Sequence, residues 1–153
     1  MNLKNSIFGA GSSGPSKHHR SFIRVTDAMT TGIVTLAPND SFDRAIELIV
    51  SGDYQHLVVI DDKQKVLGLV SKADIVGNRW RISEWRHKQV HQAMTANPIT
   101  VTMDTPLSDA ISTMIAKHLD CLPVIKYSGV LCGVLSFRGL MKFLHRMLEA
   151  AEA

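Results

Sequence analysis

The sequence lacks a long apolar run, a secretory signal and all but two cysteines, and each absence excludes a class of protein. Its longest apolar stretches are a few residues long, as at 57–60, whereas a membrane-spanning helix needs roughly 20 apolar residues. The N-terminus has Ile7 and Phe8 but no apolar core of signal-peptide length, which argues against secretion. Cys121 and Cys132 lie among apolar neighbours, so we expect buried thiols in a reducing compartment, the cytoplasm.

Acidic residues are absent from the first 24 positions, and this explains the net charge of +3. Beyond position 24 the acidic residues outnumber the basic ones by one, so the basicity belongs to the N-terminal tail. A second basic stretch spans 79–88. A nucleic-acid-binding domain usually has a basic face on its folded body, so binding of nucleic acid through the tail and this stretch is our least favoured hypothesis.

The chain after the tail contains an internal repeat with an offset of 65 residues. Ala-Met-Thr at 28–30 recurs at 93–95, and the apolar pattern of 57–60 recurs at 122–125. Two copies are too few for a solenoid, and each is too short for a core of its own, so we expect a pair packed about a pseudo-twofold axis. The predicted divisions are a flexible basic tail (1–22), a first repeat (23–76), a basic connecting helix (77–89) and a second repeat (90–153).

Each copy has the pattern strand, helix, strand, strand, helix, which predicts an α+β fold with layers of the α/β type. The helices are indicated by apolar spacing and capping residues, and the strands by β-branched runs. In the first copy we expect these elements at 33–36, 42–51, 57–60, 66–70 and from 72 onward. In the second copy we expect them at 99–101, 107–117, 122–125, 131–135 and from 137 to the C-terminus.

The last predicted helix carries an apolar stripe. Leu140, Leu144, Met147 and Leu148 follow helical spacing. We expect this stripe to pack on the domain or on a second subunit.

Segments of both copies resemble the cystathionine-β-synthase (CBS) domain. Ala-Met-Thr precedes the first strand in each copy. His-Leu-Val-Val-Ile (56–60) and Cys-Leu-Pro-Val-Ile (121–125) are similar to the family's central strand. Gly-Leu-Val-Ser-Lys-Ala-Asp (68–74) and Gly-Val-Leu-Ser-Phe-Arg-Gly (133–139) are similar to its closing strand and helix start. The resemblance spans about residues 25–145 and implies a tandem CBS pair, or Bateman module: two βαββα repeats, two clefts at their interface, and a homodimer of modules.

The resemblance implies that an adenine nucleotide or adenosyl compound binds in a cleft shared by the repeats. We assign the main cleft to Ser71, Lys72, Asp74, Thr95, Ile99, Cys121 and Leu122. Ser71 opens a helix whose N-terminus suits a phosphate, and the Asp74 carboxylate can accept hydrogen bonds from both ribose hydroxyls. The alternative is that Ser71 only caps the helix and Asp74 is a solvated acid of its first turn.

The resemblance implies a second, weaker cleft. We assign it to Thr30, Val34, Tyr54, His56 and Ser136. Gly139 occupies the position that corresponds to Asp74, so this cleft lacks the ribose acceptor. The main cleft keeps its aspartate but has Asp120 and Cys121 where many members of the family have a basic residue. We therefore expect at most one good nucleotide site, at Asp74.

No catalytic or metal-binding constellation emerges, so we expect a binding module that is not an enzyme and requires no cofactor. The favoured hypothesis is a sensor of AMP, ADP, ATP or S-adenosylmethionine that changes its dimer geometry, which a separate effector protein detects. The alternative is a ligand-free dimerisation or scaffold module.

Overall fold

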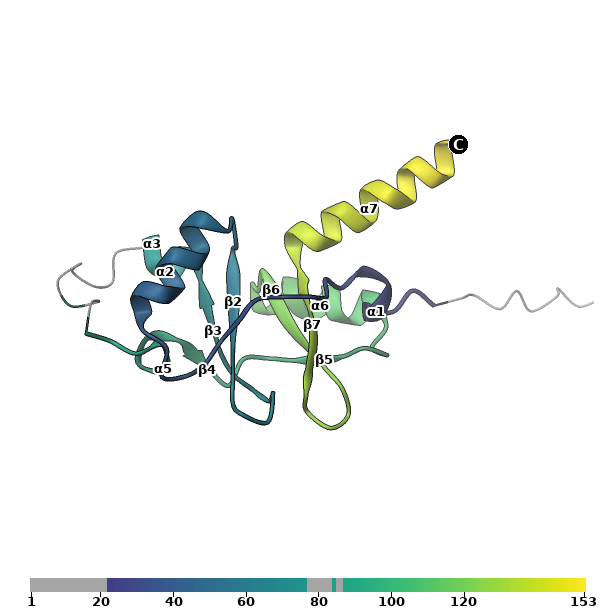
Figure 1. Ribbon diagram of the computed structural model, residues 1–153. Helices are drawn as coiled ribbons and strands as arrows, with labels where there is room; N and C mark the ends of the chain where they lie inside the picture. The colour runs from purple at the N-terminus through teal and green to yellow at the C-terminus, as the bar shows by residue number, and fades with distance from the viewer. Residues whose placement is uncertain (1–21, 77–83, 85–86) are drawn as a thin grey trace, which may run out of the picture.

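Two small β-sheets, one built mainly from each repeat, lie next to each other at the centre of the structure (Figure 1). The computed structural model describes residues 22–76, 84 and 87–153. The predicted flexible tail lies outside the described residues except for Phe22, and the predicted connecting helix lies outside them except for Glu84 and residues 87–89.

The first sheet has the strand order β1-β2-β3-β4. Strand β1 runs parallel to β2, and β3 is antiparallel to both β2 and β4. Helices α2 and α3 complete this half. The bounds are β1 Thr35–Leu36, α2 Phe42–Ser51, β2 His56–Ile60, β3 Val66–Ser71, α3 Lys72–Val76 and β4 Thr95–Ala96.

The second sheet repeats this plan with the order β5-β6-β7. Strand β5 is parallel to β6, and β6 is antiparallel to β7. The bounds are β5 Val101–Thr102, α6 Leu107–Lys117, β6 Cys121–Ile125, β7 Leu131–Ser136 and α7 Phe137–Glu152. The predicted α+β fold and order of elements are confirmed, although the first strand of each copy is shorter than predicted and excludes Ile33, Val34 and Ile99.

The predicted helix boundaries have local causes. Helix α2 begins after Ser41, whose Oγ accepts a hydrogen bond from the Arg44 amide at 3.3 Å, and it ends at Gly52. Helix α6 ends where His118 adopts a left-handed conformation, with φ of 54°. These residues stop each helix so that the next strand can enter the sheet.

The two repeats exchange their first segments, an arrangement that the repeat pattern alone did not predict. Helix α1 (Val25–Ala28) begins the first repeat, yet Val25 and Ala28 are buried in the core of the second. Helix α5 (Val90–Ala93) begins the second repeat, yet Val90 is buried in the core of the first. Each core is therefore completed by the other repeat.

Backbone pairing fixes this exchange. The amide of Thr30 donates to the carbonyl of Val134 at 2.9 Å, and the amide of Val134 donates back at 2.9 Å. A Cβ at Gly133 would lie 2.9 Å from the Thr30 carbonyl oxygen, so only glycine lets the segment cross β7 this closely. Gly68 has the same role on β3, where a Cβ would collide with Met94.

Helix α7 extends from the end of β7 away from the rest of the molecule (Figure 1). None of its residues is buried. The predicted apolar stripe is largely open to solvent within one chain, with Leu144, Met147 and Leu148 each 44–52% exposed.

Candidate ligand pocket between the repeats

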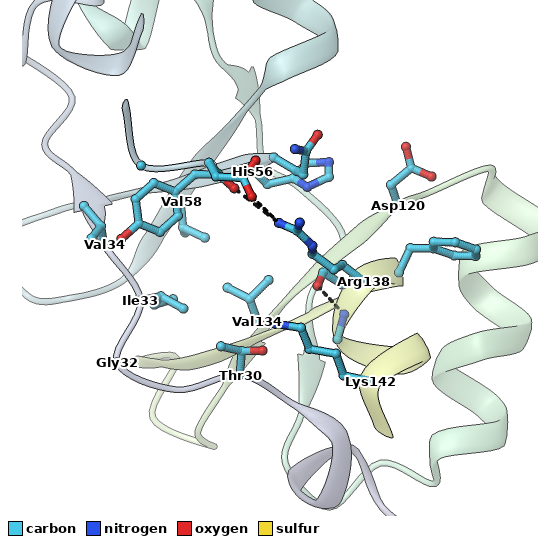
Figure 2. A pocket seen from close by; sticks show the side chains of 17 residues that line it. Thr30, Gly32, Ile33, Val34, His56, Val58, Asp120, Val134, Arg138 and Lys142 are labelled. Carbon is cyan, nitrogen blue, oxygen red and sulfur yellow. Dashed lines mark hydrogen bonds and ion pairs between the residues drawn. The ribbon is translucent and has the colours of Figure 1, made fainter. Parts of the chain in front are cut away.

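A pocket of about 560 Å³ lies between the two repeats (Figure 2). The first repeat contributes Thr30, residues 32–34, the turn at 52–55, and His56 and Val58 of β2. The second contributes Asp120, the end of β7 and the first turns of α7. Ligand pockets commonly have volumes of about 300–1,000 Å³ and lie at such interfaces, so this pocket is large enough for a nucleoside.

One wall of the pocket is apolar. Ile33, Val34 and Val58 come from the first repeat and Val134 from the second (Figure 2). Val58 is buried in the sheet, whereas Ile33, Val34 and Val134 are half-buried. This wall offers aliphatic surface for one face of a flat ring such as a purine.

The N-terminus of α7 also lines the pocket. Ser136 caps this helix, and its Oγ accepts a hydrogen bond from the Gly139 amide at 3.0 Å. A Cβ on Gly139 would lie 3.2 Å from that Oγ and 3.4 Å from the Thr30 hydroxyl oxygen, so the glycine leaves this corner open. The positive end of a helix dipole favours an anionic ligand group here.

Charged side chains surround the same end of the pocket. Arg138 and Lys142 lie one turn apart on α7, and the Lys142 side chain extends toward Thr30 and Val134 (Figure 2). The pocket also has the carboxylates of Asp53 and Asp120. Arg138 Nη1 donates to Asp53 Oδ2 at 2.9 Å, and this hydrogen bond and the charge of Arg138 lower the pKa of Asp53.

His56 is a neutral side chain at neutral pH. Burial lowers its pKa below the ordinary value, although the nearby carboxylates of Asp120 and Asp74 oppose that shift. The neutral imidazole can both donate and accept a hydrogen bond, which suits the ring nitrogens or hydroxyls of a ligand.

The structure gathers every residue that we assigned to the second cleft around this pocket. They are Thr30, Val34, Tyr54, His56 and Ser136. The three segments that carry them come from both repeats, as the family resemblance implied.

The residues assigned to the main cleft are differently placed. Ser71 Oγ accepts from the Asp74 amide at 3.0 Å, and Asp74 Oδ2 accepts from the Ser71 amide at 3.3 Å. This reciprocal pair is a capping box, so Ser71 caps α3 as the alternative predicts, whereas Asp74 is a half-buried hydrogen-bond acceptor and not a solvated acid. Lys72 is the first residue of α3, Thr95 lies in β4, and Ile99 is 43% exposed in the segment before β5.

Two of the main-cleft residues have buried side chains. Cys121 is 4% exposed, and Leu122 is fully buried in the core of the second repeat. Burial, with a smaller contribution from Asp120, raises the pKa of Cys121 to about 12. The thiol is therefore protonated at neutral pH, as expected for a buried cysteine, whereas Cys132 is only half-buried.

Sequence reasoning did not assign Asp53, Arg138 or Lys142 to a cleft. The sequence does contain features that could have identified the two cations. Arg138 lies within the helix start at Ser136–Gly139, and Lys142 follows it at i+4 on the same helix face. Asp53 offered no such signal, because its contact with Arg138 joins residues that are 85 positions apart.

A second concavity, of about 760 Å³, lies between α6 and α7. Its walls are mainly apolar, with Ile111, Met114 and Ile115 on α6 and Leu140, Phe143 and Leu144 on α7. We call this surface the α6–α7 face.

The described part of the chain offers no group of three or more His, Cys, Asp or Glu residues that could hold a metal ion. Among the described helices, none combines the length and the apolar character needed to cross a membrane.

Comparisons with known proteins agree with the sheet topology and the repeat. An uncharacterised 17.7 kDa protein from the bps2 3′ region of Acidianus ambivalens is 31% identical, with 79% of this chain and 73% of that protein covered. Homoserine O-acetyltransferase of Methanococcus vannielii is 27% identical over 73% of this chain, but the chain spans only 23% of that enzyme. The structure of CBSX2 of Arabidopsis thaliana in complex with AMP is also similar, with 31% sequence identity and a TM-score of 0.72. The match covers 81% of this chain and 97% of the CBSX2 chain. The CBS domain model matches residues 25–80 and 88–146, and the chain therefore belongs to the CBS domain family, with two tandem copies.

Proposed function

We propose that this chain is a non-catalytic regulatory module that binds an adenosine-containing ligand in the pocket between its repeats. The observation that carries this proposal is the pocket itself, which combines an apolar wall with a helix N-terminus and cationic side chains. The related CBSX2 was solved in complex with AMP, which supports the same ligand class here.

The residues of the pocket divide between two parts of such a ligand. The wall of Ile33, Val34 and Val134 suits the base, because burial of a ring against aliphatic groups is favourable. The end with Ser136 and Arg138 suits a phosphate, which gains charge-assisted hydrogen bonds and the helix dipole. The pocket at Gly139, rather than the cleft at Asp74, is thus our proposed site.

We further propose that the module acts as a homodimer through the α6–α7 face, and that ligand binding alters the dimer geometry for a separate effector protein. Exposed apolar side chains on this face include Ile115 at 70% and Phe137 at 64%. Phe137 also lines the ligand pocket, so one residue belongs to both surfaces. A ligand shifts the dimer only if it binds one geometry more tightly than the other.

Calorimetric titration of AMP, ADP, ATP and S-adenosylmethionine tests the proposal. We expect saturable binding of at least one of these ligands, at one site per chain, with a Kd of about micromolar. Asp74→Ala should retain that binding, since Asp74 is not among the residues that line the pocket.

The same titration distinguishes the alternatives. Loss of binding in Asp74→Ala would move the site to the cleft that we predicted from the sequence. No heat with any ligand, together with a tight dimer in light scattering, would favour the ligand-free scaffold.

A further inference from the structure

An ion pair connects the two repeats across the ligand pocket. Arg138 Nη1, from the first turn of α7, donates to Asp53 Oδ2 at 2.9 Å and to the Asp53 carbonyl at 3.5 Å. Asp53 lies in the turn between α2 and β2 of the first repeat. Figure 2 shows the Arg138 guanidinium directed across the pocket toward this turn.

This ion pair is weak and easily exchanged. The side chains of Arg138 and Asp53 are 58% and 68% exposed, so water competes for both partners. Exposed pairs of this kind contribute little to stability, and salt screens them. A ligand phosphate at the same position would offer Arg138 two or more oxygens and a greater negative charge than one carboxylate.

The other cleft has no equivalent of this pair. With the offset of 65 residues, Arg138 corresponds to Ala73, and Asp53 corresponds to His118. The positive charge of Lys142 likewise has only Gly77 as its counterpart. The Arg138–Asp53 ion pair is thus a property of one pocket and not of the repeat.

We propose that Arg138 is the anion-binding residue of this pocket and that Asp53 is its internal competitor, which a phosphate group of the ligand must displace. The inference rests on the proposed function and adds a specificity: the ligand is a nucleoside phosphate, not an uncharged nucleoside. Lys142, one turn further along α7, adds positive charge to the same pocket. Asp53 lowers the affinity of the pocket by occupying Arg138 when no ligand is bound.

Binding of AMP and of adenosine to three variants and one control variant tests this competition. Asp53→Asn should bind AMP about threefold more tightly than the wild type, because Arg138 then has no carboxylate partner to exchange for the phosphate. Arg138→Gln should bind AMP at least about tenfold more weakly. The double variant should bind AMP nearly as weakly as Arg138→Gln, because Asp53 acts mainly through its contact with Arg138. Adenosine affinity should stay unchanged in all three.

Asp62→Asn is the matched control. Asp62 is exposed in the turn between β2 and β3, outside the pocket, so this variant makes the same change of net charge without touching Arg138. Its AMP affinity should equal that of the wild type. Circular dichroism of each variant verifies that the fold is retained.

Pyrophosphate serves as a probe that is independent of the adenosine moiety. If adenosine compounds fail to bind but pyrophosphate binds with the same dependence on Arg138 and Asp53, the inference stands and the proposed ligand class is wrong. If AMP binds with equal affinity to the wild type, Asp53→Asn and Arg138→Gln, the inference is wrong and the proposed function stands. If neither probe binds, both are overturned.

Discussion

Val34→Trp is expected to weaken AMP binding by at least about a hundredfold, a loss of about 2.7 kcal/mol. Val34 lies in the apolar wall of the pocket and is only half-buried, so an indole in its place has room to project into the cavity. There it would occupy the volume that we assign to the base. The measurement is a calorimetric titration of AMP into the folded variant.

Ile99→Trp is the matched control for this prediction. Ile99 corresponds to Val34 in the repeat, is 43% exposed, and is one of the residues that we predicted from the sequence for the cleft of Ser71 and Asp74. We expect Ile99→Trp to bind AMP as the wild type does. The opposite pattern, with binding lost in Ile99→Trp and retained in Val34→Trp, would assign the ligand to the Asp74 cleft.

Leu57→Ala and Leu122→Ala are each expected to reduce the free energy of unfolding by about 2–5 kcal/mol. The two leucines occupy equivalent positions in the two repeats, and both are fully buried. Because Val25 and Val90 each complete the core of the opposite repeat, damage to one core removes support from the other. We therefore expect a single unfolding transition in urea, which either substitution shifts to lower concentration.

Val50→Ala provides the comparison, since Val50 is 74% exposed on α2 and its replacement should change stability by no more than about 0.5 kcal/mol. Two separate transitions, with Leu122→Ala moving only one of them, would contradict the view that the exchanged segments make the repeats one cooperative unit.

The fold was largely predictable because its elements depend on local signals. Ser41 and Gly52 bound α2, and apolar spacing defines α6 over Leu107–Lys117, as the sequence predicts. The exchange of α1 and α5 was not predictable in this way. The exchange depends on which of the two cores buries Val25 and which buries Val90. The sequence around a buried valine does not show which core the side chain enters.

The candidate site was less predictable than the fold. The family resemblance identified the polar helix starts at Ser71 and Ser136, but a similar hydrogen-bonded cap forms at both. What distinguishes the clefts is the open corner at Gly139 and the cations Arg138 and Lys142. The directions of the Arg138 and Lys142 side chains depend on how the two repeats pack against each other. Sequence spacing does not define that packing.

Because position 139 has no aspartate, the sequence predicts that this cleft is the weaker of the two. In the structure the same glycine leaves space beside the Thr30 and Ser136 hydroxyls, where a side chain would otherwise fill the corner. We propose that the cationic residues nearby compensate in affinity for the missing ribose acceptor when the ligand carries a phosphate. This is the physical reason for placing the proposed site here.

The most direct test of the proposed site is an NMR titration of the full chain with AMP, following backbone amide shifts. We expect the largest shifts around the pocket, at Thr30, Val34 and Gly139. Largest shifts at Ser71, Asp74 and Thr95, or no shifts at millimolar AMP, would contradict it.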